Sequence, residues 1–253
     1  MTSEFTFCIC TYNSERTLER CLSSIRGLSE NSRVIVLDHN SNDRTLEIAA
    51  RYDASLEKEN TGLGFARQRC LDLADTKYIV FVDSDVEIVD QDFLRHAKRA
   101  LDRRENGAVV GVAVGHRFFF GLPASLLVLR KEDFQGQIIP KYIDARETFF
   151  LQKRLDLLNL KTVYARNAMR HNSLYRKFKP EWEGANTRIL PSPAINEIGF
   201  TAKVILLLTL NSRSVKNLFY LPIFYLKFLR GFFNPGPWLR LRRQEGEEIE
   251  VNQ

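Results

Sequence analysis

The first 82 residues alternate short apolar runs with amphipathic segments, and this alternation constrains the fold more than any other feature of the chain. Four runs rich in β-branched and aromatic residues have the length of strands, and a segment with helical periodicity follows each of the first three. The predicted strands are residues 5–10, 34–37, 54–56 and 78–82. Because strands that alternate with helices are joined by crossovers, the sequence predicts an α/β fold with a Rossmann-like, mainly parallel mixed sheet flanked by helices.

Polar side chains follow three of these strands at the point where each strand ends. The tripeptide TYN follows the first, Asp38 closes the second, and Asp83 and Asp85 follow the fourth. Open α/β sheets bind ligands at the carboxyl ends of their strands. Two carboxylates one residue apart repel each other unless a cation lies between them, and oxygen ligands favour Mg²⁺ or Mn²⁺ with a phosphate-bearing substrate. The alternative, a polar turn before a helix that starts near Asp90, stays open.

The two parts of the chain differ in charge. The chain has 253 residues, 44% of them hydrophobic, which allows one sizeable core with an appendage. Residues 1–100 hold 13 Lys and Arg against 17 Asp and Glu, whereas residues 101–253 hold 24 against 14. The basic residues stand beside apolar runs rather than in a recognition helix, which favours an anionic lipid surface or a phosphate-bearing substrate over nucleic acid. A solvated surface is the alternative explanation.

Cysteine usage and the first residues bear on the compartment. The four cysteines, at positions 8, 10, 21 and 70, lack the paired spacing of a metal site and are typical of small buried residues in a reducing compartment. No basic stretch followed by an apolar run precedes the first predicted strand, so we expect no cleaved signal peptide. The sequence therefore predicts an intracellular protein.

From residue 200 the composition changes to two strongly apolar runs, FTAKVILLLTL and LFYLPIFYLKFLRGFF, which polar and charged residues interrupt. A membrane-spanning helix needs about 20 predominantly apolar residues, and neither run reaches that length cleanly. We therefore predict amphipathic helices that lie in the membrane interface, with Trp238, Arg240, Arg242 and Arg243 at the lipid headgroups. A buried helical hairpin on the core, or the interface of a homo-oligomer, is the open alternative.

Three segments resemble the family-2 glycosyltransferases of the GT-A fold. They are FCICTYNSERTLERCLSSI, VIVLDHNSNDRTLEIA and NTGLGFARQRCLDLADTKYIVFVDSDVEI, in the order and spacing of that family. The resemblance covers the first 90 residues well and continues more weakly to residue 190. It implies a GT-A domain at residues 1–199, with a nucleotide-sugar-binding half at 1–106 and an acceptor half at 107–199, before a membrane-associating tail at 200–253.

The resemblance also implies a donor site at the strand ends. Thr11, Tyr12 and Asn13 would line the nucleobase and ribose pocket, and Asp38 would accept hydrogen bonds from N–H groups of the base. Arg67 occupies the position of the arginine in the family's Ala-Arg-Asn motif and would lie beside the nucleotide. In this chain the motif reads ARQ, which is a mild departure.

For the metal, the resemblance implies that Asp85 binds a divalent cation, Mn²⁺ or Mg²⁺, directly. Asp83 would face the ribose or the metal, Ser84 would contact the nucleotide sugar, and His171 would complete the ligand set. Such a cation neutralises the negative charge that develops on a diphosphate leaving group. A single histidine more often has a structural role, so His171 keeps that second interpretation.

Inverting transfer to a hydroxyl needs a general base near the attacking oxygen. Relatives commonly use an acidic residue of a Glu-Asp pair, and here Glu147 matches the first residue while Thr148 replaces the second. Glu147 is the first candidate for the base and Asp144 the second. For both, a carboxylate that only stabilises a helix N-terminus is the alternative. A phosphate acceptor would need no strong base, because its attacking oxygen is already anionic.

These expectations describe a metal-dependent, inverting glycosyltransferase that transfers a sugar from a UDP- or GDP-sugar to a polyprenyl-phosphate or lipid-linked saccharide acceptor. We expect a peripheral or monotopic protein on the cytoplasmic side of an anionic membrane, with no nucleic-acid partner. Two alternatives stay open. A sugar-1-phosphate nucleotidyltransferase has a similar sheet but a Gly-rich basic loop that TYNSE lacks, and a catalytically silent, nucleotide-sugar-binding membrane scaffold is compatible with the missing Glu-Asp pair.

Overall fold

The computed structural model describes residues 4–172, 179–212 and 215–239. The chain divides into two compact units, which are treated separately below. The first unit comprises residues 1–116, 120–141 and 147–174, and the second comprises residues 117–119, 142–146 and 175–253. Three stretches that are far apart in the sequence therefore make up the second unit.

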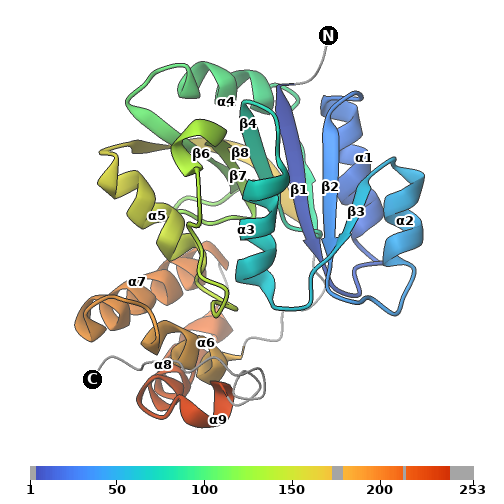
Figure 1. The fold of residues 1–253 in the computed structure, drawn as a ribbon. Coiled ribbons are helices and arrows are strands. Elements are labelled where there is room, and N and C mark those ends of the chain that lie inside the picture. Colours follow the sequence, from blue (N-terminus) through green and yellow to red (C-terminus); the bar gives the residue numbers. More distant parts are fainter. Residues whose placement is uncertain (1–3, 173–178, 213–214, 240–253) are drawn as a thin grey trace. The chain divides into compact units, whose positions relative to one another are not determined.

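A single eight-stranded sheet organises the first unit (Figure 1). Its strands are β1 (Phe5–Thr11), β2 (Arg33–Asp38), β3 (Ser55–Lys58), β4 (Tyr78–Val82), β5 (Val86–Ile88), β6 (Asn106–Ala113), β7 (Leu126–Arg130) and β8 (Lys161–His171), in the order β3-β2-β1-β4-β7-β6-β8-β5. The pairs β2–β3, β1–β2, β1–β4 and β6–β8 are parallel, whereas β4–β7, β6–β7 and β5–β8 are antiparallel. The predicted mainly parallel mixed sheet is confirmed.

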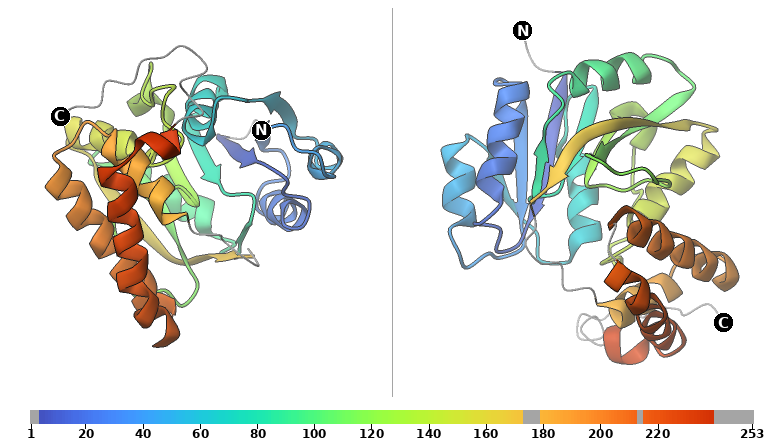
Figure 2. Two further views of the ribbon diagram at one scale, coloured as in Figure 1. Left: turned by 90° about the horizontal axis from the view of Figure 1, so that it is seen from below. Right: turned by 180° about the vertical axis from the view of Figure 1, so that it is seen from behind.

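Helices cover both faces of this sheet (Figures 1 and 2). They are α1 (Leu18–Leu28), α2 (Thr45–Arg51), α3 (Leu63–Leu73), α4 (Phe93–Leu101), α5 (Thr148–Leu157) and the 3-10 helix η1 (Lys131–Phe134). Helices α1 and α3 lie on opposite faces, as the front and back views agree. Side chains alternate along β1 to serve both faces, since Phe7 and Ile9 join the core with α1 whereas the Cys8 thiol lies against the Cys70 carbonyl of α3.

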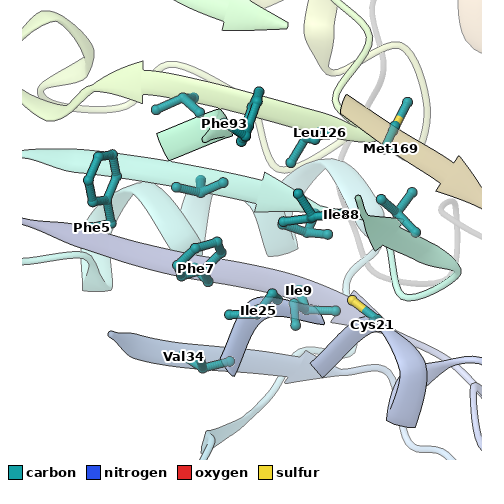
Figure 3. Close-up of a cluster of buried hydrophobic side chains, with 14 of the residues drawn as sticks. Phe5, Phe7, Ile9, Cys21, Ile25, Val34, Ile88, Phe93, Leu126 and Met169 are labelled. Carbon is teal, nitrogen blue, oxygen red and sulfur yellow. The ribbon is translucent and has the colours of Figure 1, made fainter. Parts of the chain in front are cut away.

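The main core lies between the sheet and the helices α1 and α4 (Figure 3). Phe7 and Ile9 from β1, Ile25 from α1 and Phe93 from α4 are all fully buried in it. Burial of one such side chain stabilises the fold by about 1.5–3 kcal/mol. The cluster therefore holds β1 and its neighbours in register, so that the strand ends form a rigid edge.

One part of the predicted secondary structure is wrong. The sequence predicts irregular structure for residues 116–142, yet β7 lies within this range, with all five residues buried between β4 and β6. Phe, Gly and Pro residues flank this strand without interrupting it, and they concealed it. In addition, the short strand β5 follows the acidic pair directly.

The second unit is helical and contains the predicted C-terminal helices. They are α6 (Pro180–Arg188), α7 (Ala194–Ser212), α8 (Val215–Phe233) and α9 (Gly236–Leu239). The domain boundary expected after residue 199 falls inside α7. Helices α6 and α8 approach backbone to backbone: a Cβ on Gly184 would clash with the Phe228 carbonyl oxygen, and a Cβ on Gly231 would clash with the Glu181 carbonyl oxygen. Only glycine permits a contact this close at both positions.

Candidate active site

The ends of β1 and β2 are joined by a buried hydrogen-bond network around one carboxylate. Thr11 and Asp38 are paired in register as the last residues of their strands, and Thr11 Oγ1 donates to Asp38 Oδ1 at 2.8 Å. Ser41 donates twice to the same carboxylate, from its backbone N to Oδ2 at 2.8 Å and from its hydroxyl to Oδ1 at 2.5 Å. Asp38 is fully buried. These three hydrogen bonds fix the carboxylate in the interior, and its predicted bond to a nucleobase stays a prediction.

The loops after three strands are tied to one another. Asn13, in the left-handed region with φ +48°, accepts the backbone N–H of Asn42 at 2.9 Å and donates its own N–H to Ser41 Oγ at 2.8 Å. The hydroxyl groups of Ser14 and Ser84 lie 3.0 Å apart and link the β1 loop to the acidic pair. The structure thus brings the predicted residues Thr11, Asn13, Asp38 and Ser84 to one edge of the sheet.

Two aromatic side chains stand exposed at this edge. Tyr12 is 61% exposed, and its ring meets the ring of His39 edge to face at a centroid distance of 5.7 Å. Nδ1 of His39 lies 2.8 Å from the Glu59 carbonyl oxygen. Because a carbonyl oxygen only accepts, Nδ1 is the donor in this contact, and the contact fixes the orientation of the ring. Sequence reasoning missed His39, although its position directly after Asp38 in a strand-end loop was a usable signal.

Arg67 lies at the centre of the site, buried on the face of α3 that covers the sheet. Its Nη2 donates to Asp83 Oδ1 at 2.8 Å, its Nη1 donates to the Ala124 carbonyl oxygen at 3.1 Å, and its Nε lies 3.0 Å from Glu147 Oε1. This last contact is an ion pair without hydrogen-bond alignment. The guanidinium also stands 5.5 Å from the centre of the Phe81 ring.

The two carboxylates decide the charge state of this arginine. Burial alone would lower the pKa of Arg67, but Glu147 and then Asp83 raise it above its usual value. The guanidinium is therefore a permanent cation held between two carboxylates. A buried charge is costly unless it is paired, and here one partner directly follows β4 and the other directly precedes α5.

Gln68, which replaces the asparagine of the family motif, has a structural role in this chain. Its Oε1 accepts the backbone N–H groups of Ile138 and Ile139, both at 2.9 Å, and its Nε2 donates to the Gly136 carbonyl oxygen at 3.0 Å. The longer amide side chain thus satisfies three backbone groups of the segment that follows η1. The departure from the motif is explained by this segment and leaves Arg67 in place.

Asp85 and His171 form the candidate metal site. His171 is paired with Val86 across the antiparallel strands β5 and β8, and its Nδ1 lies 3.7 Å from Asp85 Oδ1. Carboxylate oxygen and imidazole nitrogen are both ligands of Mn²⁺, so the pair fits the implied cation. Within the described residues no three His, Cys, Asp or Glu side chains gather as a metal-binding group. The other ligands would therefore come from the diphosphate and water.

The two candidate bases belong to different units. Glu147, directly before α5, is buried in the first unit beside Arg67, whereas Asp144 belongs to the second unit. Asp83 is likewise committed to Arg67, which leaves Asp85 as the member of the acidic pair that is associated with the histidine. The predicted roles of Asp144 and Glu147 in proton transfer stay predictions.

This mixed sheet, with an acidic pair after β4 and a set of polar groups at the ends of β1 and β2, defines a nucleotide-sugar transferase of the GT-A fold. The sequence profile of the family described as Glycosyl transferase family 2 matches residues 6–178, and the chain belongs to this family. It is therefore a glycosyltransferase, as the motifs indicated, and the nucleotidyltransferase alternative is set aside.

Similar proteins agree with this assignment. The poly(ribitol-phosphate) beta-N-acetylglucosaminyltransferase TarS of Staphylococcus aureus (strain MW2) is 23% identical over 205 residues, which cover 76% of this chain and 32% of that protein. The chain spans less than a third of the length of the curated relatives it matches. The activities of those longer proteins therefore do not transfer to this chain as a whole.

Two solved structures show the same fold. One is the mannosyltransferase PcManGT from Pyrobaculum calidifontis in complex with GDP-Man and Mn²⁺. It has a TM-score of 0.62 at 16% identity, and the alignment covers 98% of this chain and 77% of that chain. Glucosyl-3-phosphoglycerate synthase from Mycobacterium tuberculosis, in complex with Mn²⁺ and UDP-glucose, has a TM-score of 0.57 at 18% identity and covers 73% and 76%. At such identities the similarity establishes the fold alone.

Proposed function

We propose that this glycosyltransferase transfers a sugar, with inversion, from a UDP- or GDP-sugar to a membrane-associated acceptor, a polyprenyl phosphate or a lipid-linked saccharide. The observation that carries the donor half is the pairing of Asp85 with His171 at 3.7 Å, next to Asp83 bound to Arg67. One acidic residue pairs with an imidazole, which is itself a ligand for divalent cations, and the other is oriented by a guanidinium.

The residues of the first unit have distinct parts in this proposal. Asp85 and His171 hold Mn²⁺ or Mg²⁺, which neutralises charge on the leaving diphosphate when it is bound. Asp83, oriented by Arg67, faces the ribose. The exposed ring of Tyr12 offers a face to the nucleobase, and the exposed ring of His39 offers a polar ring nitrogen, Nε2. Fixed polar groups of this kind lower the barrier, because they need no reorganisation during the reaction.

The acceptor half of the proposal is supported by the outward faces of α7 and α8. In α8, Phe228, Gly231 and Phe232 are buried, so this side packs inside the unit. The opposite side of α8 is exposed, and it is mostly apolar with two basic residues. Its residues are Tyr220, Ile223, Leu226, Lys227, Arg230 and Phe233. On α7 the exposed apolar residues are Ile195, Phe200, Leu206 and Leu210.

An apolar outward face with Lys and Arg is typical of helices that lie in an anionic membrane interface. We therefore propose a peripheral or monotopic protein on the cytoplasmic side of the membrane. Among the described residues one helix, over Ala194–Asn211, is long and apolar enough to cross a bilayer, a criterion that core helices of soluble proteins also meet. Arg240, Arg242 and Arg243, predicted to contact headgroups, lie outside the described residues.

A donor panel tests the proposal. The melting temperature of the purified protein is measured with each UDP- or GDP-sugar, once with Mn²⁺ and once with a chelator. The donor that raises it most is then used to assay sugar transfer to a short polyprenyl phosphate in detergent and to soluble acceptors. Saturation at 100 times the dissociation constant stabilises by about 2.7 kcal/mol, and we expect each effective donor to stabilise the protein more with metal than with chelator. Stabilisation by no donor would contradict the donor half, and transfer only to soluble acceptors would contradict the membrane half.

A further inference from the structure

We infer that Glu147 is a positioning residue, which holds Arg67 against Asp83 and thereby organises the donor site, and that it is not the base. The inference deepens the proposed function, because it rests on Asp83 facing the donor. It concerns three residues from three elements: Arg67 of α3, Asp83 after β4, and Glu147 before α5.

The side chain of Glu147 does not cap α5. The residue occupies the N-cap position of the helix, but its side chain makes no capping hydrogen bond to the first turn. It points instead to the guanidinium of Arg67, at 3.0 Å. The carboxylate thus pairs with a buried arginine instead of capping the first turn of α5.

The two carboxylates at the ends of this array differ in exposure. The side chains of Glu147 and Arg67 are 8% and 6% exposed, whereas that of Asp83 is 37% exposed. Glu147 is thus the buried end, Arg67 the centre and Asp83 the end that a ligand can reach. A general base must come within about 2.6–3.2 Å of the attacking oxygen. A carboxylate that is buried and paired with an arginine is poorly placed for that contact.

The other contacts of Arg67 explain why a second carboxylate is needed. The Phe81 ring and the Ala124 carbonyl fix the guanidinium on two further sides, in a place that excludes water. Asp83 alone is a half-exposed partner that must also serve the donor. Removing one partner of a buried ion pair strongly destabilises a protein. Glu147 therefore holds Arg67 in place, and Nη2 of Arg67 orients Asp83.

The test separates affinity from turnover in Glu147→Gln. Positioning predicts that the dissociation constant for UDP or GDP with Mn²⁺ rises about tenfold, in the range found for residues in one charge network. It also predicts that kcat falls less than tenfold and that the pH profile of kcat/KM keeps its acidic limb. A base predicts an unchanged dissociation constant and a fall in kcat of about 10² to 10⁴, and that result would overturn the inference.

A double-mutant cycle with Arg67→Met measures the coupling between Glu147 and Arg67 in nucleotide affinity. A general base would show no such coupling. If Glu147 acts through Arg67, Glu147→Gln has little further effect on nucleotide affinity once Arg67 is replaced, whereas independent effects add. Full additivity would count against positioning. If Glu147→Gln does not fold, Glu147→Asp, which withdraws the carboxylate from Arg67 and keeps its charge, is measured in the same way.

The matched control is Asp133→Asn. Asp133 also pairs with a buried arginine, at 2.9 Å from Arg130 Nη1, but it lies at η1. We expect this variant to lower the melting temperature without changing nucleotide affinity, so an equal loss of affinity in the control would overturn the inference. Absence of nucleotide binding in the wild-type protein is a different result, which contradicts the proposed function first and the inference with it.

Discussion

His171 lies opposite Val86 on neighbouring antiparallel strands, and this pairing brings its Nδ1 to 3.7 Å from Asp85 Oδ1. The two residues are distant in the sequence, yet the short strand β5 that follows the acidic pair fixes their separation. Asp85 lies in the turn that leads directly into β5, and His171 ends β8, so the β5–β8 pair anchors both candidate ligands.

The first prediction concerns this pair. Asp85→Asn should abolish the Mn²⁺-dependent part of UDP or GDP binding, because an amide oxygen carries no charge to bind the cation. The free energy of unfolding should change by no more than about 0.5 kcal/mol, as it does for most surface substitutions. Calorimetric titrations with metal and with chelator measure this. Asp92→Asn, an exposed change nearby in the sequence, is the control, and undiminished metal-dependent binding in Asp85→Asn would refute the assignment.

The second prediction compares Asp38 with its neighbour His39. Asp38→Ala should destabilise the fold by about 1–3 kcal/mol, because Thr11 and Ser41 lose a buried acceptor, and should weaken nucleotide binding with or without metal. His39→Ala should weaken binding and leave stability unchanged, since the ring is exposed. Urea unfolding and nucleotide titration separate the two. An unchanged affinity in His39→Ala would remove this residue from the site.

The third prediction concerns the helix contact in the second unit. Gly231→Ala should destabilise the protein by about 1–3 kcal/mol, as overpacking does, because the added methyl group meets the backbone of Glu181. Gly199→Ala is the matched control: nothing lies within 4 Å of a Cβ there, and alanine favours a helix. Equal unfolding curves for both variants would show that α6 and α8 do not pack so closely in solution.

The fourth prediction concerns membrane binding. Ile223→Glu with Leu226→Glu should prevent flotation with vesicles that contain anionic lipids, because two charges replace apolar area on the outward face of α8. Leu157→Glu, which changes an exposed leucine of the first unit, should float like the wild type. High salt should weaken binding through the loss of about 1 kcal/mol per basic residue. A wild-type protein that never floats would refute the interfacial helices, and extraction by detergent alone would favour a spanning helix.

The fifth prediction concerns the buried thiols. Burial raises the pKa of both Cys21 and Cys70, so both remain protonated at pH 8. Because the thiolate is the reactive form, iodoacetamide at this pH should modify neither residue in the folded protein, while both react in denaturant. Peptide mass mapping gives the result, and rapid labelling of Cys21 in the native state would contradict its placement in the core.

The sequence predicted those parts of the site that depend on local pattern. Thr11, Asp38 and the acidic pair could be predicted because each lies in the sequence directly at the end of a run with the pattern of a strand. The contact of Arg67 with Glu147 was not found, since it depends on the approach of α3 and α5 and has no local signature. β7 was missed for a related reason: its apolar run is short, and pairing on both sides, rather than composition, makes it a strand.

The composition of the second unit from three separate stretches has a practical consequence. Asn211 of α7 accepts the backbone N–H groups of Arg117 and Phe118, both at 3.1 Å, and Glu197 binds Arg146 at 2.9 Å. A stop codon before α7 would therefore remove the partners of two loops that lie far upstream in the gene. The C-terminal helices cannot be exchanged between relatives as a cassette, and any chimera must carry residues 117–119 and 142–146 from the same parent.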